Sequence, residues 1–126
     1  MGTVLKYLLD SVILIDHFNG IEQATRFLED QGAQSAVSVI TRAEVLVGFS
    51  EEAEPLALDL LDHFPVLPIT TDIADGAARL RRYGRLKLPD AFQAAMAATH
   101  QLILVTRNTR DFQPGGSPDV LIPYSL

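Results

Sequence analysis

Short apolar runs alternate with helix-length segments along this chain, and the alternation restricts the fold more than any other feature of the sequence. The runs that have the length of buried strands cover residues 4–9, 36–40, 66–69, 102–105 and 120–122. The segments with helical patterning or helix start signals are 12–17, 21–30, 41–49, a stretch after the acidic run 51–54 that ends at Phe64, 73–83 and 89–99. The pattern predicts a three-layer α/β/α sandwich with a central, mostly parallel sheet of four to five short strands.

Capping and turn residues indicate where these segments begin and end. Asp10 and Ser11 can cap the first helix, and Thr71 or Asp72 can cap the helix over residues 73–83. The Thr-x-x-Glu spacing at residues 41–44 is that of a capping box. The sequence Pro-Gly-Gly-Ser-Pro at residues 114–118 predicts a turn before the last strand.

The length and composition are those of one ordinary domain, and we expect residues 1–126 to form a single domain. The chain is 48% hydrophobic, which is sufficient for one sizeable core. No apolar run approaches the roughly 20 residues of a membrane span. Residues 1–9 are too few and too weakly basic for a secretion signal. We therefore expect a soluble, cytoplasmic protein with no membrane partner.

The composition also excludes several kinds of site. The chain has no cysteine, which rules out disulfides, thiolate metal sites and cysteine nucleophiles. Its histidines, His17, His63 and His100, lack the spacing of a zinc site. There is no glycine-rich phosphate-binding motif.

Charge is distributed very unevenly along the chain. The net charge of -6 argues against a polyanionic partner, because nucleic-acid binding relies on Lys and Arg. However, three basic and thirteen acidic residues precede Arg79, whereas residues 79–110 hold seven basic residues and one acid, Asp90. The basic segment is either the solvated side of a helix and its following loop or a surface for nucleic acid.

Four carboxylates fall where predicted strands pass into loops or helices: Asp10, Glu44, Asp90 and Asp111. In an open parallel sheet, ligands bind beyond the carboxyl ends of the strands, and we expect all four acids to converge there. Acids that converge repel one another unless a divalent cation lies among them, and carboxylate oxygens suit Mg2+ or Mn2+. Two such ions, or one ion with a positioned water, would serve in-line attack on a phosphodiester.

Each acid also has an ordinary structural explanation. Asp10 can be a helix cap, Glu44 can complete the capping box, and Asp90 can interact with a helix dipole. Asp111 can be a turn residue. Four acids at one predicted edge favour a site, with Asp16 as a peripheral candidate. Thr106 and Asn108 add neutral oxygens to the same loop, where the Thr106 hydroxyl could hold a metal-bound water.

Four sequence segments together resemble the PIN domain, and more narrowly the VapC toxins of prokaryotic toxin-antitoxin pairs. They are Tyr-Leu-Leu-Asp-Ser at 7–11 with Asp16 six residues after Asp10, Ile-Thr-Arg-Ala-Glu-Val at 40–45, Leu-Pro-Asp-Ala-Phe-Gln-Ala-Ala at 88–95, and Leu-Val-Thr-Arg-Asn-Thr-Arg-Asp-Phe at 104–112. The resemblance covers essentially the whole chain in the family's order. The Thr-Arg-Asn-x-x-Asp-Phe string is its most specific part.

The resemblance implies a metal-dependent endoribonuclease in which Asp10 and Asp90 are the central ligands of Mg2+ or Mn2+. Glu44 would complete the ion's ligands or act as general base, and Asp111 would bind directly or through water. Thr106 matches the family's hydroxyl residue near the metal, and Asn108 its loop-ordering amide. Cleavage of RNA would leave a 5'-phosphate and a 3'-hydroxyl.

The resemblance also implies partners and shows one departure. Toxins of this type form homodimers and are silenced by a cognate antitoxin, whose Arg would pair with the carboxylates and displace metal. Phe92 and Gln93 stand where relatives usually carry two aliphatic residues. We expect Gln93 to affect local packing or the dimer contact, and not the metal site.

Other classes fit the sequence less well. A phospho-receiver domain shares the length, the layering and an acidic Mg2+ pocket, but it needs an Asp where the middle strand here ends in Ile69-Thr70. A haloacid-dehalogenase-type phosphatase needs Asp-x-Asp, and Val12 stands two places after Asp10. A PIN nuclease outside a toxin-antitoxin pair, and a PIN-like module that only binds a partner, are further alternatives. The intact set of four acids argues against the last.

Overall fold

The computed structural model describes residues 4–84, 86–112 and 118–126. Its elements in chain order are β1 (Tyr7–Leu9), α1 (Ser11–Phe18), α2 (Glu22–Gln31), the 3-10 turn η1 (Gly32–Gln34), β2 (Ser35–Ser38), α3 (Val39–Val47), α4 (Glu54–Leu61), β3 (Val66–Leu67), α5 (Thr71–Tyr83), α6 (Leu88–His100), β4 (Ile103–Val105) and β5 (Val120–Leu121). In the described part of the chain, no helix has both the length and the apolar character needed to cross a membrane.

The strands form one parallel sheet in the order β3-β2-β1-β4-β5. The first strand is central: Tyr7 lies opposite Ser35 on one side and Ile103 on the other. All strands therefore run the same way, and their carboxyl ends meet at one edge. This confirms the predicted parallel sheet, although each strand spans fewer residues than its apolar run.

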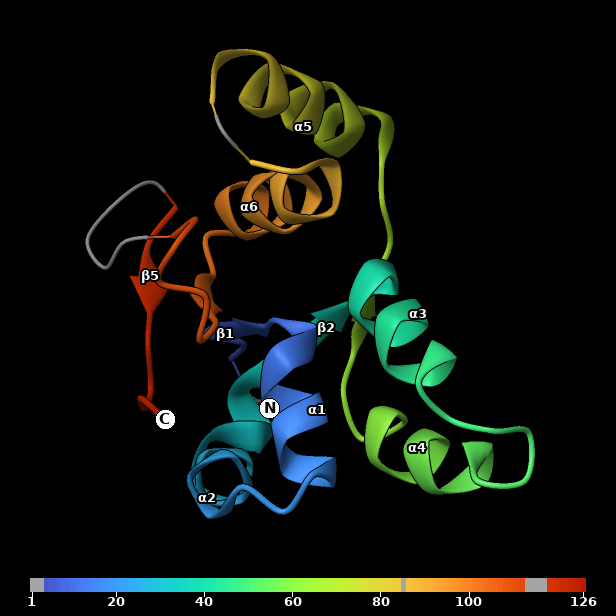
Figure 1. Cartoon of the computed structure of the whole chain (residues 1–126). Helices are drawn as coiled ribbons and strands as arrows, with labels where there is room; N and C mark the ends of the chain where they lie inside the picture. Colours follow the sequence, from blue (N-terminus) through green and yellow to red (C-terminus); the bar gives the residue numbers. More distant parts are fainter. Residues whose placement is uncertain (1–3, 85, 113–117) are drawn as a thin grey trace.

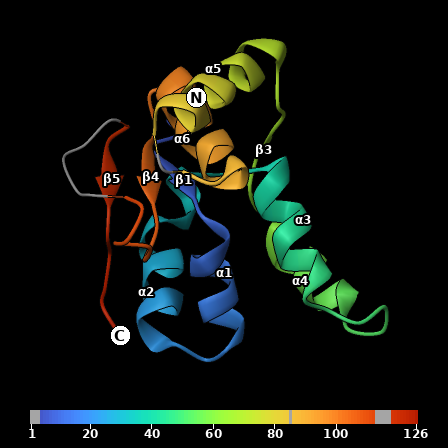
Figure 2. The same cartoon turned by 45° about the horizontal axis from the view of Figure 1, so that its top comes forward.

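Helices cover both faces of the sheet, as predicted for a three-layer fold. Figure 1 shows α5 and α6 on one face and α1 with α2 on the other, and the view in Figure 2 agrees. Successive residues of β1 point to opposite faces: Leu8 joins the core under α5 and α6, and Leu9 joins the core under α1, α3 and α4. One central strand thus holds both cores together.

The start of α3 differs from the prediction. Residues 39 and 40 were expected to extend the second strand, but β2 ends at Ser38 and the helix begins at Val39. The Ser38 hydroxyl is the cap and accepts a hydrogen bond from the Thr41 backbone N–H at 3.0 Å. The predicted capping box is therefore wrong, because Thr41 and Glu44 both lie inside the helix. The β-branched residues Val39 and Ile40 favour a strand locally, but the serine cap determines the boundary.

Smaller differences occur elsewhere. The cap of α5 is Thr70, whose Oγ1 accepts from the Ile73 N–H at 3.2 Å, and not Thr71 or Asp72. Asp10 caps α1 as predicted, since its side chain accepts from the Ser11 N–H. The turn predicted at residues 114–118 lies outside the described residues except for Pro118, and so does Arg85.

A buried ion pair joins α1 to the segment after β4 and to the C-terminal residues. The Asp16 carboxylate is 5% exposed and accepts two hydrogen bonds from Arg107, at 2.8 and 3.0 Å. The Tyr124 hydroxyl donates a third at 2.8 Å. Hydrogen bonding to Arg107 lowers the pKa of Asp16 although burial acts in the opposite direction. Asp16 is therefore a charged anchor for the loop that follows β4.

We predict that Asp16→Asn lowers the free energy of unfolding by about 2 kcal/mol at pH 7, since hydrogen bonds to a charged group are lost. The folded-state pKa of Asp16 lies below its unfolded value, so this contribution is full above about pH 4 and is lost as the pH falls through the folded pKa. Urea unfolding at pH 7 and pH 3 measures both effects. The exposed Asp75→Asn variant is the control, and equal stability of the two variants at pH 7 would contradict the prediction.

Candidate metal centre

The four predicted acids, which we call the acid quartet, come from four different parts of the chain and meet at the carboxyl edge of the sheet. Asp10 directly follows the central strand β1, and Asp111 lies in the loop after its neighbour β4. Glu44 lies in the middle of α3, and Asp90 lies in the first turn of α6. Asp10 is buried, Asp90 and Asp111 are partly buried, and Glu44 is exposed.

The electrostatics show that the quartet shares one location. Burial raises the pKa of Asp90 most, and the charges of Asp10 and Asp111 raise it further, against the opposing charge of Lys87. Glu44 is exposed as a whole residue, but desolvation of its carboxylate by the surrounding protein raises its pKa. A hydrogen bond with Ser11 opposes this rise, and the charges of Asp10 and Asp90 add to it. Each member is thus within electrostatic reach of at least one other. The structure places the four acids within electrostatic reach of one another at one edge of the sheet, and their joint binding of a metal ion stays a prediction.

The oxygen donors of the quartet fit a hard divalent cation. None of the ion pairs found within the described residues includes a quartet member, so its charge has no basic partner of that kind there. As the side chains stand, no three His, Asp or Glu residues in the described ranges are close enough to hold a metal ion. The quartet therefore offers carboxylate oxygens as ligands, and no ion pair of the described residues neutralises its negative charge. Its side chains would have to rotate toward one another to bind one ion.

Both oxygens of the Asp10 carboxylate are held by hydrogen bonds. Oδ1 accepts from the Ser11 N–H at 2.9 Å and from Gln93 Nε2 at 3.4 Å. Oδ2 accepts from the Thr106 hydroxyl at 2.7 Å. The hydroxyl proton of Thr106 is thus directed at Asp10 and is not free for a water. Thr106, which is buried, therefore orients the Asp10 carboxylate.

Asn108 shapes the loop that carries Asp111. Its Nδ2 donates to Asp111 Oδ2 at 3.0 Å, and its Oδ1 accepts from the Asp111 N–H at 3.2 Å. Its own N–H donates to Thr106 Oγ1 at 3.1 Å. Thr106, Asn108 and Asp111 therefore form one hydrogen-bonded unit, which matches the loop-ordering role expected of the amide.

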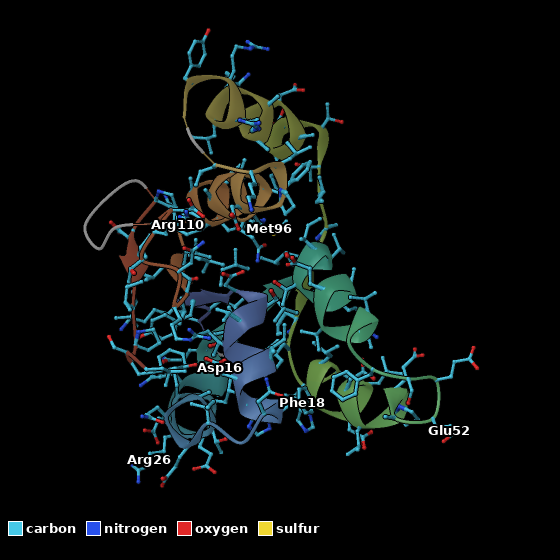
Figure 3. All side chains as sticks on the ribbon, viewed as in Figure 1. Asp16, Phe18, Arg26, Glu52, Met96 and Arg110 are labelled. Carbon is cyan, nitrogen blue, oxygen red and sulfur yellow. The ribbon has the colours of Figure 1, made fainter. Side chains whose placement is uncertain are left out.

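Two residues make contacts that the sequence analysis did not predict. Asp16 is not a peripheral member of the quartet, because Arg107 and Tyr124 bind its carboxylate; Figure 3 shows it on α1. Gln93 was expected to leave the metal site untouched, yet it is 1% exposed and contacts Asp10. The polar residue in an otherwise alanine-rich buried face of α6 was the signal that could have located it.

An apolar groove opens beside the quartet, between α1 and α3. It encloses about 250 Å³, and Glu44 stands among its lining residues. The other lining residues are Ile15, Phe18, Asn19, Val45, Gly48 and Phe49. Ile15 is 38% exposed, so part of this apolar surface is open to solvent.

Comparisons with known proteins agree with this geometry. A family model described as PIN domain matches residues 7–113. Ribonuclease VapC10 of Mycobacterium tuberculosis is 34% identical over 112 residues, which cover 83% of this chain and 84% of the relative. Among solved structures, a toxin-antitoxin complex from Klebsiella pneumoniae has a chain with TM-score 0.88 and 42% identity, over 96% of this chain and 100% of that one.

A further structure shares the fold alone. It is FitAcB from Neisseria gonorrhoeae, with TM-score 0.79, 24% identity and coverage of 95% of this chain and 99% of that one. The fold of the chain and the sequence matches indicate the same family. The chain therefore belongs to the PIN domain family, as a VapC-type member.

Proposed function

We propose that this chain is a metal-dependent endoribonuclease and the toxin of a toxin-antitoxin pair. The observation that carries the proposal is the acid quartet, four carboxylates at one sheet edge; burial raises the pKa of Glu44 and Asp90, and the charges of neighbouring quartet members raise it further. The similarity to ribonuclease VapC10 and to a chain of a toxin-antitoxin complex supports both parts of it.

Within this proposal, Asp10 and Asp90 are the central ligands of Mg2+ or Mn2+, and Glu44 and Asp111 complete the site. The ion, when bound, supplies a water of lowered pKa and offsets the charge that develops on the phosphate oxygens. Thr106 holds Asp10 through its hydroxyl, and Asn108 holds Asp111. The residues thus divide into carboxylates that bind and neutral side chains that orient them.

The reaction is hydrolysis of an RNA phosphodiester. Water attacks phosphorus in line with the 3'-oxygen, and Glu44, where it does not itself bind the ion, would accept the proton of that water as general base. The bond between phosphorus and the 3'-oxygen breaks, and that oxygen takes up a proton. The products are a 3'-hydroxyl on one fragment and a 5'-phosphate on the other.

Exposed basic residues near the quartet and on the neighbouring helix α5 would bind the RNA backbone. Lys87 is exposed, and its charge reaches Asp90. Arg110 is exposed and precedes Asp111 in the same loop, and the last turns of α5 carry exposed Arg79, Arg81 and Arg82. These cations offset the repulsion that a chain of net charge -6 would otherwise exert on a polyanion.

The groove between α1 and α3 is a suitable site for the antitoxin. An amphipathic segment could bury apolar side chains against Ile15, Phe18 and Phe49, and an Arg from it would reach Glu44 and the other carboxylates. Such an Arg would compete with the metal ion for the same charges. A homodimer, as the resemblance implies, completes the proposed assembly.

We predict that the purified chain cleaves a mixture of tRNA and ribosomal RNA in Mn2+, and that EDTA stops cleavage. Asp90→Asn should lower the rate at least 100-fold, because one charged ligand is lost. Asp75→Asn, an exposed acid on α5, is the matched control and should cleave at the wild-type rate. Gel analysis with end-group mapping measures the rate and the 5'-phosphate. Undiminished cleavage by Asp90→Asn would overturn the assignment of the site.

The same substitution should stabilise the metal-free chain. The folded-state pKa of Asp90 is raised, so its ionised form disfavours folding as the pH rises through that pKa. In EDTA at pH 7, Asp90→Asn should raise the melting temperature by on the order of 3 °C, and the gain should shrink toward pH 4. Asp75→Asn again serves as control. A lower melting temperature for Asp90→Asn at pH 7 would contradict the proposed repulsion.

We predict that the product of an adjacent, small upstream reading frame, coexpressed with this chain, co-purifies with it and suppresses cleavage. Ile15→Lys places a charge in the apolar groove and should prevent co-purification, whereas Leu56→Lys on exposed α4 should not. Affinity pull-down followed by the cleavage assay measures both. If neither variant nor wild type retains the neighbour's product, a PIN nuclease outside a toxin-antitoxin pair becomes the better assignment.

A further inference from the structure

A buried amide connects the helix that carries Asp90 to the other parts of the metal centre. Gln93 lies one helical turn after Asp90 and is 1% exposed. Its Nε2 donates to Thr41 Oγ1 at 2.7 Å and to Asp10 Oδ1 at 3.4 Å, and its Oε1 accepts from the Ser38 hydroxyl at 2.6 Å. Three groups thus surround one amide, from the end of β2, from α3 and from the junction between β1 and α1.

The protons of this network have only one consistent direction. The Thr41 hydroxyl donates to the Leu9 carbonyl at 3.2 Å, so its oxygen receives the Gln93 N–H. The Ser38 oxygen accepts the Thr41 backbone N–H, and its single proton is donated to Gln93 Oε1 at 2.6 Å in preference to the more distant Thr41 Oγ1 at 3.4 Å. The second amide proton of Gln93 is then directed at Asp10. The reverse orientation would place Oε1 against a carboxylate oxygen, which is repulsive.

This arrangement leaves the two Asp10 oxygens unequal. A carboxylate oxygen offers about two acceptor positions. The Ser11 N–H and the Gln93 N–H use those of Oδ1, whereas the Thr106 hydroxyl uses one position of Oδ2. Oδ2 is therefore the oxygen with capacity left for a cation. At 3.4 Å the Gln93 contact is long for a hydrogen bond, and its effect rests on the amide being held by Ser38 and Thr41.

The same network joins the elements that carry three members of the quartet. Gln93 belongs to α6 with Asp90, and Thr41 belongs to α3 with Glu44. Leu9 ends the central strand β1, and Asp10 directly follows it. Within the described residues no buried side-chain nitrogen or oxygen lacks a partner, so a shift of any one element would leave a polar group unpaired.

We propose that Gln93 is a positioning residue of the metal centre: its amide holds the Asp10 carboxylate with Oδ2 free for the ion and fixes α6 and α3 relative to it. This rests on the proposed metal-dependent function. Partners that orient a metal ligand through a hydrogen bond typically change metal affinity 10- to 100-fold when they are removed. A residue that merely filled the core would change stability alone.

The test is Mn2+ binding to the purified full chain without RNA, followed by electron paramagnetic resonance at a temperature where every variant is folded. Gln93→Met keeps an unbranched side chain of similar length but removes the amide, and its affinity should fall on the order of 10-fold. The control is Met96→Ala. Met96 is fully buried in α6 and is labelled in Figure 3. Its truncation destabilises the same helix without removing a contact to Asp10, so this variant should keep wild-type affinity for Mn2+.

Ser38→Ala provides a second variant, since it removes the anchor of Gln93 Oε1 and leaves the amide present. It should weaken Mn2+ binding in the same direction but less, and it replaces Gln93→Met if that variant does not fold. Wild-type affinity in the folded Gln93→Met variant, or in Ser38→Ala if only that variant folds, would overturn the proposal, and so would an equal loss in Met96→Ala.

The outcomes separate this proposal from the proposed function. If Mn2+ binding depends on Gln93 but no RNA is cleaved, the positioning role stands and the ribonuclease assignment fails. If wild type cleaves RNA and Gln93→Met binds Mn2+ as wild type does, the ribonuclease assignment stands and the positioning role fails. A wild-type chain that binds no Mn2+ overturns both.

Discussion

A carboxylate at the end of a buried strand has to be satisfied by hydrogen bonds or by an opposite charge, and Asp10 occupies such a position. Hydrogen bonds from Ser11, Gln93 and Thr106 hold it, but none of these partners carries a positive charge. Asp10 thus has no basic partner at the edge of the sheet, where its charge adds to the effect of burial in raising the pKa of Glu44 and of Asp90. The rest of the centre is arranged around this unneutralised group.

Asp16 is an aspartate like Asp10, but its charge is balanced by a cationic side chain of the protein. It lies on α1, six residues after Asp10, and Arg107 binds it in two places with a lowered pKa as the result. Arg107 stands between Thr106 and Asn108, which act on Asp10 and Asp111. One ion pair thus stabilises the loop that orients the acids, while the acids themselves have no such partner among the described ion pairs.

This division explains why the acids of the proposed metal site lower the stability of the metal-free folded chain. Burial raises the pKa of Asp90, and the charges of Asp10 and Asp111 raise it further, so its charged form disfavours the folded chain at neutral pH. Binding a divalent cation would reverse that effect. In the metal-free chain, the polar network of Gln93, Ser38 and Thr41 holds α6, β2 and α3 together. Every buried side-chain nitrogen or oxygen in it has a hydrogen-bond partner.

The amino-acid sequence by itself determined the α/β class, the parallel sheet and the placement of the acid quartet toward one edge of that sheet. Apolar runs have the period and length of buried strands, and parallel strands bring their carboxyl ends to one edge. It predicted segment boundaries less well: local preference for a strand at Val39 and Ile40 lost to the Ser38 cap. Only the tertiary structure decided that Asp16 is paired with Arg107 and that Gln93 meets Asp10, because these partners are 91 and 83 residues apart and no local pattern encodes such a contact.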